Sequence, residues 1–156
     1  MAITSAICNS FKVEILTATH NFTSSSGDDF KLALYSSNSA TLSKATTAWA
    51  AASDPTADPT DTYEVTTTSS GYTSGGNSLT STTPALSGDT ACCLFASTSW
   101  GSTASFTARG CLIYNSDSSN KAVCVVNFGA DKTVTTGTFT VEFPAQTAGN
   151  AIIQIA

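Results

Sequence analysis

The chain has 156 residues, only 11% of them charged, and a formal net charge of -5 at pH 7. Its six basic residues are scattered, so it lacks the cation cluster that nucleic acids and anionic membranes select. We therefore expect neither of these partners, and the length favours a single domain over residues 1–156.

The composition predicts an all-β protein. Ser and Thr make up roughly a third of the chain, and Thr is β-branched and suits a half-exposed pleated surface. The first residues have neither a basic region nor a long apolar run, so we expect no signal peptide and synthesis in a cytoplasm. No apolar run reaches the roughly 18 residues that a membrane span needs.

The N-terminal part contains two strand candidates. Phe11–Leu16 is predicted as a strand with alternate residues on one face, namely Phe11, Val13 and Ile15. A loop of small polar residues follows at Thr23–Asp29. Phe30–Ser36 alternates cleanly, which predicts a strand with one face toward the core, formed by Phe30, Leu32 and Leu34, and with Lys31, Ala33 and Tyr35 facing outward.

The next segment is the only one compatible with a helix. Thr41–Ala52 fits a short helix or an irregular edge strand equally well. The Pro- and Asp-rich residues 53–61 predict an extended surface loop, because Pro restricts both itself and its predecessor. Thr62–Thr68 is predicted as a β-branched strand, and the Gly-rich residues 69–78 as turns that expose Tyr72.

The rest of the chain consists of short strands. Leu79–Leu86 is predicted at a sheet edge, because Pro84 cannot donate to a ladder. Ala91–Ser97 is predicted as a buried strand, and five more strands are predicted at residues 104–110, 111–115, 121–128, 137–143 and 151–156. Residues 111–115 and 121–128 are apolar on both faces and are predicted to be central. The pattern favours an antiparallel β-sandwich or jelly roll of about nine or ten short strands.

The five cysteines have no zinc-site spacing, and a single histidine cannot complete a Cys/His site. We expect the thiols to be reduced and buried as small hydrophobic groups. A bridge between Cys111 and Cys124, on adjacent predicted strands, is the alternative. The cysteines are Cys8, Cys92, Cys93, Cys111 and Cys124.

A catalytic set is not evident in the sequence. His20, the only histidine, is predicted to be a polar or capping residue, and no GxSxG elbow accompanies it. The carboxylates are predicted to be solvated loop charges or outward-facing strand residues, namely Asp28, Asp29, Asp54, Asp58, Asp61, Glu14, Glu64 and Glu142. Asp54, Asp58 and Asp61 do not match a calcium loop. We predict no enzyme, no metal and no cofactor.

Aromatic residues are the best binding candidates, because Trp and Tyr offer large contact areas at modest entropy cost. Trp49 lies beside the acidic loop, Trp100 lies in the turn-like sequence TSWGS, and Tyr72 lies among glycines. Core packing is the alternative for each of them. The predicted interface residues are Trp49, Tyr72 and Trp100.

Six stretches resemble a family of small virion proteins of tailed bacteriophages: Ala45–Trp49, Tyr63–Val65, Gly71–Ala85, Phe106–Asn115, Lys121–Gly129 and Lys132–Pro144. They are strand and turn sequences rather than active-site signatures. Members look like head decoration or cement proteins, or other parts of the virion surface. Asp54–Thr60 and the Cys92–Cys93 pair depart from the family pattern.

The resemblance implies a non-enzymatic capsid cement protein in the virion. Such a protein would bind over junctions of the major capsid protein, as a homo-oligomer, either a trimer or a dimer. A tail or fibre module whose Tyr72 and Trp100 stack on a host glycan is the alternative. A small hydrolase built on His20 or on two carboxylates is the third hypothesis.

Overall fold

The computed structural model describes residues 3–36, 41–50, 63–65 and 71–156. These residues form two antiparallel sheets and one short helix, which confirms the predicted all-β sandwich class. The elements in chain order are β1 (Ala6–Ile7), α1 (Asn9–Leu16), β2 (Phe30–Tyr35), β3 (Asn77–Leu79), β4 (Ser81–Ser87), β5 (Thr90–Phe95), β6 (Thr98–Asn115), β7 (Lys121–Val141) and β8 (Ile153–Ile155).

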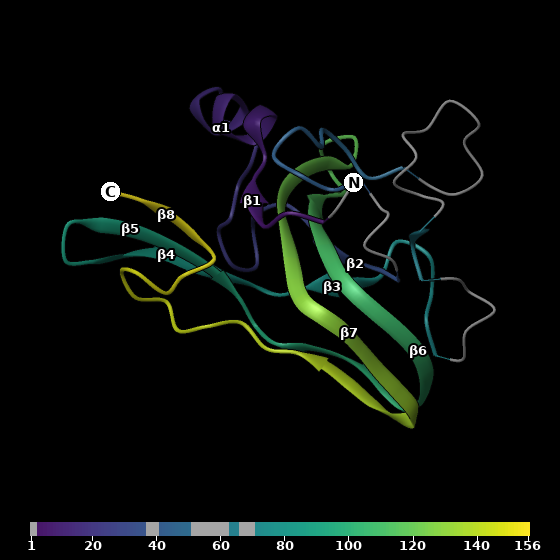
Figure 1. The fold of residues 1–156 in the computed structure, drawn as a ribbon. Helices are drawn as coiled ribbons and strands as arrows, with labels where there is room; N and C mark the ends of the chain where they lie inside the picture. The colour runs from purple at the N-terminus through teal and green to yellow at the C-terminus, as the bar shows by residue number, and fades with distance from the viewer. Residues whose placement is uncertain (1–2, 37–40, 51–62, 66–70) are drawn as a thin grey trace.

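The larger sheet has the strand order β1-β7-β6-β2-β3 (Figure 1). The predicted strands 104–110 and 111–115 are parts of one strand, β6, and 121–128 and 137–143 largely belong to β7. Register shifts along the β6–β7 pair allow both strands to stay paired over their length while they bend. The predicted central position of residues 111–115 and 121–128 is confirmed.

Strand β2 confirms one predicted strand but not its outward face. Ala33 and Tyr35 are fully buried, as are Leu32 and Leu34. Tyr35 forms an isolated bridge with Glu64, and β2 lies between β6 and β3. A strand covered on both faces reads as a continuous apolar run, and this explains why alternation is not the rule here.

The predicted strand Phe11–Leu16 is wrong, because these residues form helix α1. Phe11 and Ile15 lie four residues apart, which places them on one helical face. Phe11 is buried and Ile15 half-buried, whereas Val13 is exposed. The helix ends where the Thr17 amide and hydroxyl both donate to the Glu14 carbonyl, followed by Ala18 with a φ of 55°.

The segment after β2 contains no helix in its described part. Residues 41–50 form turns, and Ala48 makes an isolated bridge with Lys121. Residues 51–52 and the predicted loop 53–61 lie outside the described residues. Of the predicted strand 62–68, residues 63–65 are described, and Glu64 pairs with Tyr35 there.

The smaller sheet has the order β4-β5-β8 and extends to one side beneath α1, with the C-terminus beside it (Figure 1). Strand β4 is an edge strand that carries Pro84, as predicted, and β8 confirms the predicted C-terminal strand. Aromatic rings join the two sheets: Phe30 of β2 and Phe95 of β5 are tilted with centroids 5.4 Å apart, and Phe22 stacks on Phe30 at 4.4 Å. No helix in the described part of the chain is long and apolar enough to cross a membrane.

Candidate functional site

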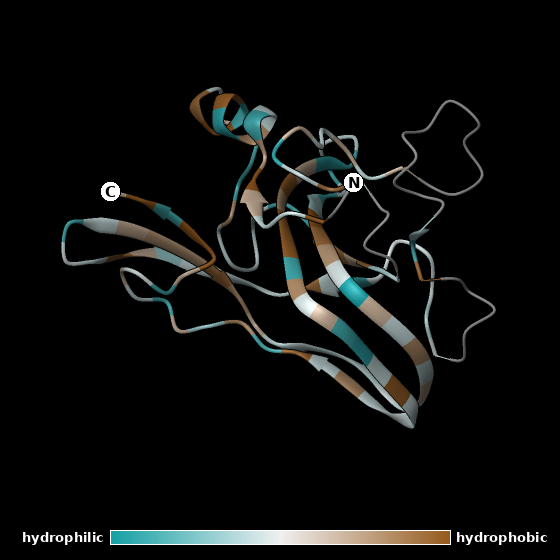
Figure 2. Ribbon diagram, in the orientation of Figure 1, coloured by the Kyte–Doolittle hydropathy of each residue, from teal (hydrophilic) through white to brown (hydrophobic). Residues whose placement is uncertain are grey.

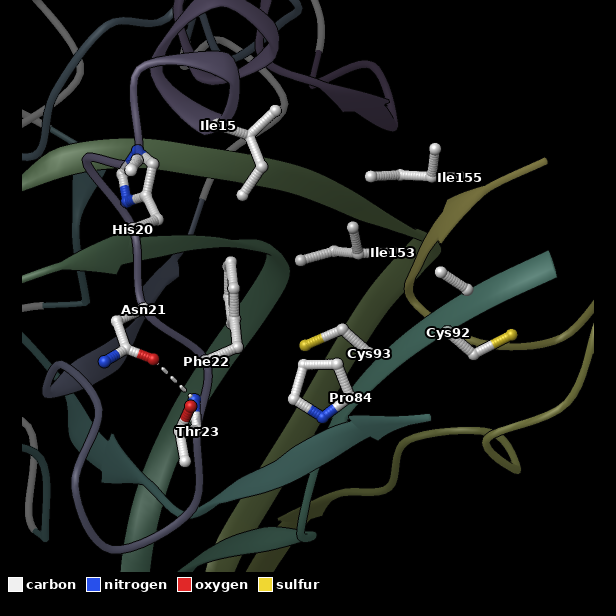
Figure 3. Close-up of a pocket in the computed structure, with 12 residues that line it drawn as sticks. Ile15, His20, Asn21, Phe22, Thr23, Pro84, Cys92, Cys93, Ile153 and Ile155 are labelled. Atoms are coloured by element: carbon white, nitrogen blue, oxygen red, sulfur yellow. Dashed lines mark hydrogen bonds between the residues drawn. The ribbon is translucent and has the colours of Figure 1, made fainter. Parts of the chain in front are cut away.

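An open apolar cleft of about 490 Å³ lies between α1 and the smaller sheet (Figure 3). Ile15 points into it from α1, and Phe22 from the segment that follows α1. The sheet supplies Pro84, Cys93, Ile153 and Ile155. The volume falls within the range of about 300–1,000 Å³ that is typical of binding clefts.

The register of the smaller sheet explains its apolar face. Ala91 pairs with Ile155 and Cys93 with Ile153, so these four side chains lie on one face. Leu86 pairs with Ala91 and extends the same row onto β4. Because side chains on opposed residues of paired strands share a face, three strands contribute to one apolar wall.

A second hollow of about 290 Å³ adjoins the cleft at the end of α1. Both hollows are lined by Ile15, Ile153 and Ile155. Figure 2 shows hydrophobic residues at the end of α1 and at both ends of β8. The first cleft and this hollow therefore form one apolar depression along β8. From here on, the term apolar cleft means both hollows together.

Two exposed hydrophobic side chains, Leu16 and Ile155, line the apolar cleft. In the described part of the chain, the four exposed large hydrophobic residues are Val13 (63%), Leu16 (86%), Leu86 (74%) and Ile155 (59%). Leu86 continues the apolar row of the sheet onto β4, whereas Val13, two residues before Ile15 on α1, points away from the cleft. Gathering of exposed apolar groups in one place marks a binding surface, whereas scattered ones do not.

His20 is among the residues that line the cleft, and it is buried. The Asn115 side-chain oxygen accepts from the Asp117 and Ser118 amides, so its amide nitrogen must donate to His20 Nδ1, 3.0 Å away. His20 Nε2 then carries the proton and donates to Glu14, 2.9 Å away. Both ring nitrogens are engaged in holding the fold, as the predicted polar role requires.

Glu14 connects His20 to β7. Its other oxygen accepts from Lys121 Nζ at 2.8 Å. Partial burial raises the pKa of the Glu14 carboxyl, but the hydrogen bonds from Lys121 and His20 outweigh it, so that this pKa lies below its ordinary value. The ion pair ties α1 to β7 beside the cleft.

The Cys93 thiol beside the cleft is not activated. All five cysteines are buried and free, as predicted, and Cys111 and Cys124 are not bridged in the structure. Burial raises the pKa of the Cys93 thiol to about 12, so it is protonated near neutral pH. Since the thiolate is the reactive form, Cys93 lines the cleft as a small apolar group.

The predicted interface residues lie elsewhere. Tyr72 and Trp100 are 5% and 3% exposed, so the predicted exposure of Tyr72 is wrong, and Trp100 lies within β6 rather than in a turn. Their rings stack with centroids 6.0 Å apart. Trp49 is half-buried and stacks on Tyr114 at 5.2 Å.

Glu64 brings two of these residues together. It is buried rather than solvated, which corrects the prediction of an outward-facing strand residue. Its carboxylate accepts from the Tyr72 hydroxyl at 2.7 Å and from the Trp49 indole at 3.3 Å. A hydrogen-bonded carboxylate surrounded by donors tolerates burial, but nothing in the local sequence TYEVT signals it.

Asp54, Asp58 and Asp61 lie outside the described residues. Within the described ranges, no group of three His, Cys, Asp or Glu side chains has an arrangement that would hold a metal ion.

Comparison with protein-family models, with curated proteins and with solved structures finds no match to the chain.

Proposed function

We propose that the chain is a structural protein of a tailed-phage virion, a cement protein that stabilises the head. In this role it docks over junctions of the major capsid protein, in many copies. The observation that carries the proposal is the apolar cleft itself, whose lining includes the exposed side chains of Leu16 and Ile155. This is the surface on which another protein would gain most by excluding water.

The resemblance of six stretches to small virion proteins supplies the kind of partner. The low share of charged residues adds to this, because few charges on each copy limit the like-charge repulsion between closely packed copies. The glycan-binding alternative depended on Tyr72 and Trp100, whose rings are buried. A hydrolase built on His20 would need a free ring nitrogen, and Glu14 and Asn115 engage both.

The proposal is tested by mixing the purified chain with expanded shells of the phage that encodes it. We expect saturable binding at hundreds of sites, and a higher melting temperature of the decorated shells in calorimetry. The double variant Leu16→Asp/Leu86→Asp should bind about tenfold more weakly or worse, because it places two charges on the apolar surface. Both side chains are exposed, so the substitutions should leave the fold intact. Thr140→Asp, exposed on β7, is the matched control.

Absence of binding to shells would refute the head role. Binding of only a few copies at one vertex would refute cement in favour of a tail component.

A further inference from the structure

We infer that the apolar cleft receives an extended apolar segment of a partner protein, which adds as a strand beside β8 and places an acidic group next to Lys12. This inference rests on the proposed docking role and names the chemistry of the docked partner. It comes from three features of the described residues: the edge of β8, the walls of the cleft and the charge at its mouth.

The two edges of the smaller sheet are built differently. On β4, Pro84 removes a donor, and the register shifts between Thr82 and Ala85. Pro and irregular pairing protect an edge strand from adding another strand. On the other edge, β8 pairs with β5 in unbroken register and has no Pro and no charge. Within the described chain, its outer edge pairs with no strand, so its main-chain groups are available.

The walls of the cleft suit side chains from an extended segment. Successive side chains of a strand point to opposite faces, so every second one would enter the cleft. There they meet Ile15 and Leu16 on one side and Ile153 on the other. A small apolar molecule could fill the hollow, but it would leave the main-chain groups at the outer edge of β8 unpaired. An extended protein segment does both, because strand addition supplies main-chain hydrogen bonds as well as apolar side chains.

The charge at the mouth specifies the segment further. Among the described residues lining the two hollows, Lys12 is the one Lys or Arg, and none is Asp or Glu. Lys12 makes no ion pair with another described residue. A carboxylate at one end of the segment would complement it. A second copy paired through the same edge would bring residues 153–155, whose side chains include no carboxylate.

The test is a display selection of random dodecapeptides on the purified full chain. We expect enrichment of peptides with alternating apolar residues and with Asp or Glu at one end. The variant Lys12→Glu should enrich basic ends instead, because it reverses the charge at the mouth. Lys132→Glu, a matched change at an exposed position on β7, should keep the preference for acidic ends.

Affinity measurements on an enriched peptide separate the three features. Lys12→Glu should weaken binding by about three- to fivefold, the size expected of an exposed ion pair. Leu16→Asp should weaken it by about tenfold or more. Every second residue of the added strand directs its N–H group toward β8. N-methylation of these residues should abolish binding, whereas N-methylation of the residues between them should not.

Several results would overturn the inference. They are a lack of enriched peptides, enrichment that Leu16→Asp leaves unchanged, apolar residues at helical spacing, or binding of an apolar dye alone. A dimer of the chain that Leu16→Asp dissociates would assign the cleft to a second copy. The selection contains no phage shell, so a chain that selects these peptides but ignores shells would refute the head role alone.

Discussion

The Glu64 carboxylate is buried and yet makes four hydrogen bonds, so its charge is compensated by donors. They come from the Tyr72 hydroxyl, the Gly75 amide, the Trp49 indole and the Ser74 hydroxyl. Glu64→Gln replaces one acceptor oxygen by a donor that faces other donors. We expect a loss of about 2–3 kcal/mol in the free energy of unfolding, measured by urea denaturation.

Glu142→Gln is the control for this change, because Glu142 is exposed. It should leave the unfolding midpoint nearly unchanged. Equal effects of the two substitutions would mean that the Glu64 charge does not contribute to folding.

The lowered pKa of the Glu14 carboxyl makes the free energy of unfolding depend on pH. Burial raises the pKa of the Glu14 carboxyl, but the hydrogen bonds from Lys121 and His20 hold this pKa in the folded state below the ordinary value of 4.5. As the pH falls, the Glu14 carboxyl is therefore protonated at a higher pH in the unfolded chain than in the folded protein, and acid favours unfolding. The stabilisation is fully present above pH 4.5 and is lost as the pH falls through the folded-state pKa.

Thermal melts of the wild type and of Glu14→Gln test this dependence. The wild type should melt higher at pH 7, and the difference should shrink as the pH falls below about 4.5. A difference that stays constant down to pH 3 would show that the effect of Glu14 is not ionic.

At the scale of elements, the β6–β7 pair contains its own aromatic cluster. Trp100 lies against Phe139 at 6.0 Å and against Phe106 at 6.2 Å, and Tyr72 covers it. The Trp100 indole N–H is buried and finds no acceptor among the described residues. A two-stranded ribbon is marginal alone, so this cluster stabilises the part of the pair that extends beyond β2.

Two substitutions at Trp100 separate packing from hydrogen bonding. Trp100→Ala should cost about 3–5 kcal/mol in chemical denaturation, because it leaves a cavity. Trp100→Phe keeps an aromatic ring and removes the unpaired donor, so it should cost less than half as much. Equal losses would mean that the indole N–H has a partner that stabilises the fold.

The sequence predicts the class of the fold because alternation and turn residues are local signals. It fails at Phe11–Leu16, where Phe11, Val13 and Ile15 fit a strand while Phe11 and Ile15 alone fit a helix. The structure buries the pair at helical spacing and leaves Val13 in water. Similarly, TSWGS has the composition of a turn, but tertiary pairing with β7 holds it in a strand.

The apolar cleft could not be predicted, because its walls come from opposite ends of the chain. Ile15 and Ile155 read locally as ordinary core residues, and only the fold brings them to one opening. The interface prediction failed for a related reason. Aromatic size identifies residues worth burying, but it does not distinguish the protein's own core from a partner's surface.

At the scale of the whole molecule, the proposed docking has a direction. Helix α1 and β8 lie on the side of the apolar cleft, whereas residues 131–136 of β7, all exposed except the half-buried Val134, lie along the other sheet (Figure 1). If shells bind the chain through the cleft, amide exchange should slow in residues 9–16 and 153–155, because β8 gains main-chain partners and α1 loses contact with water. Hydrogen-exchange mass spectrometry of free and shell-bound protein measures both regions at once. Exchange in residues 131–136 should stay unchanged, and slowing confined to those residues would place the docking surface on β7 and contradict the role given to the cleft.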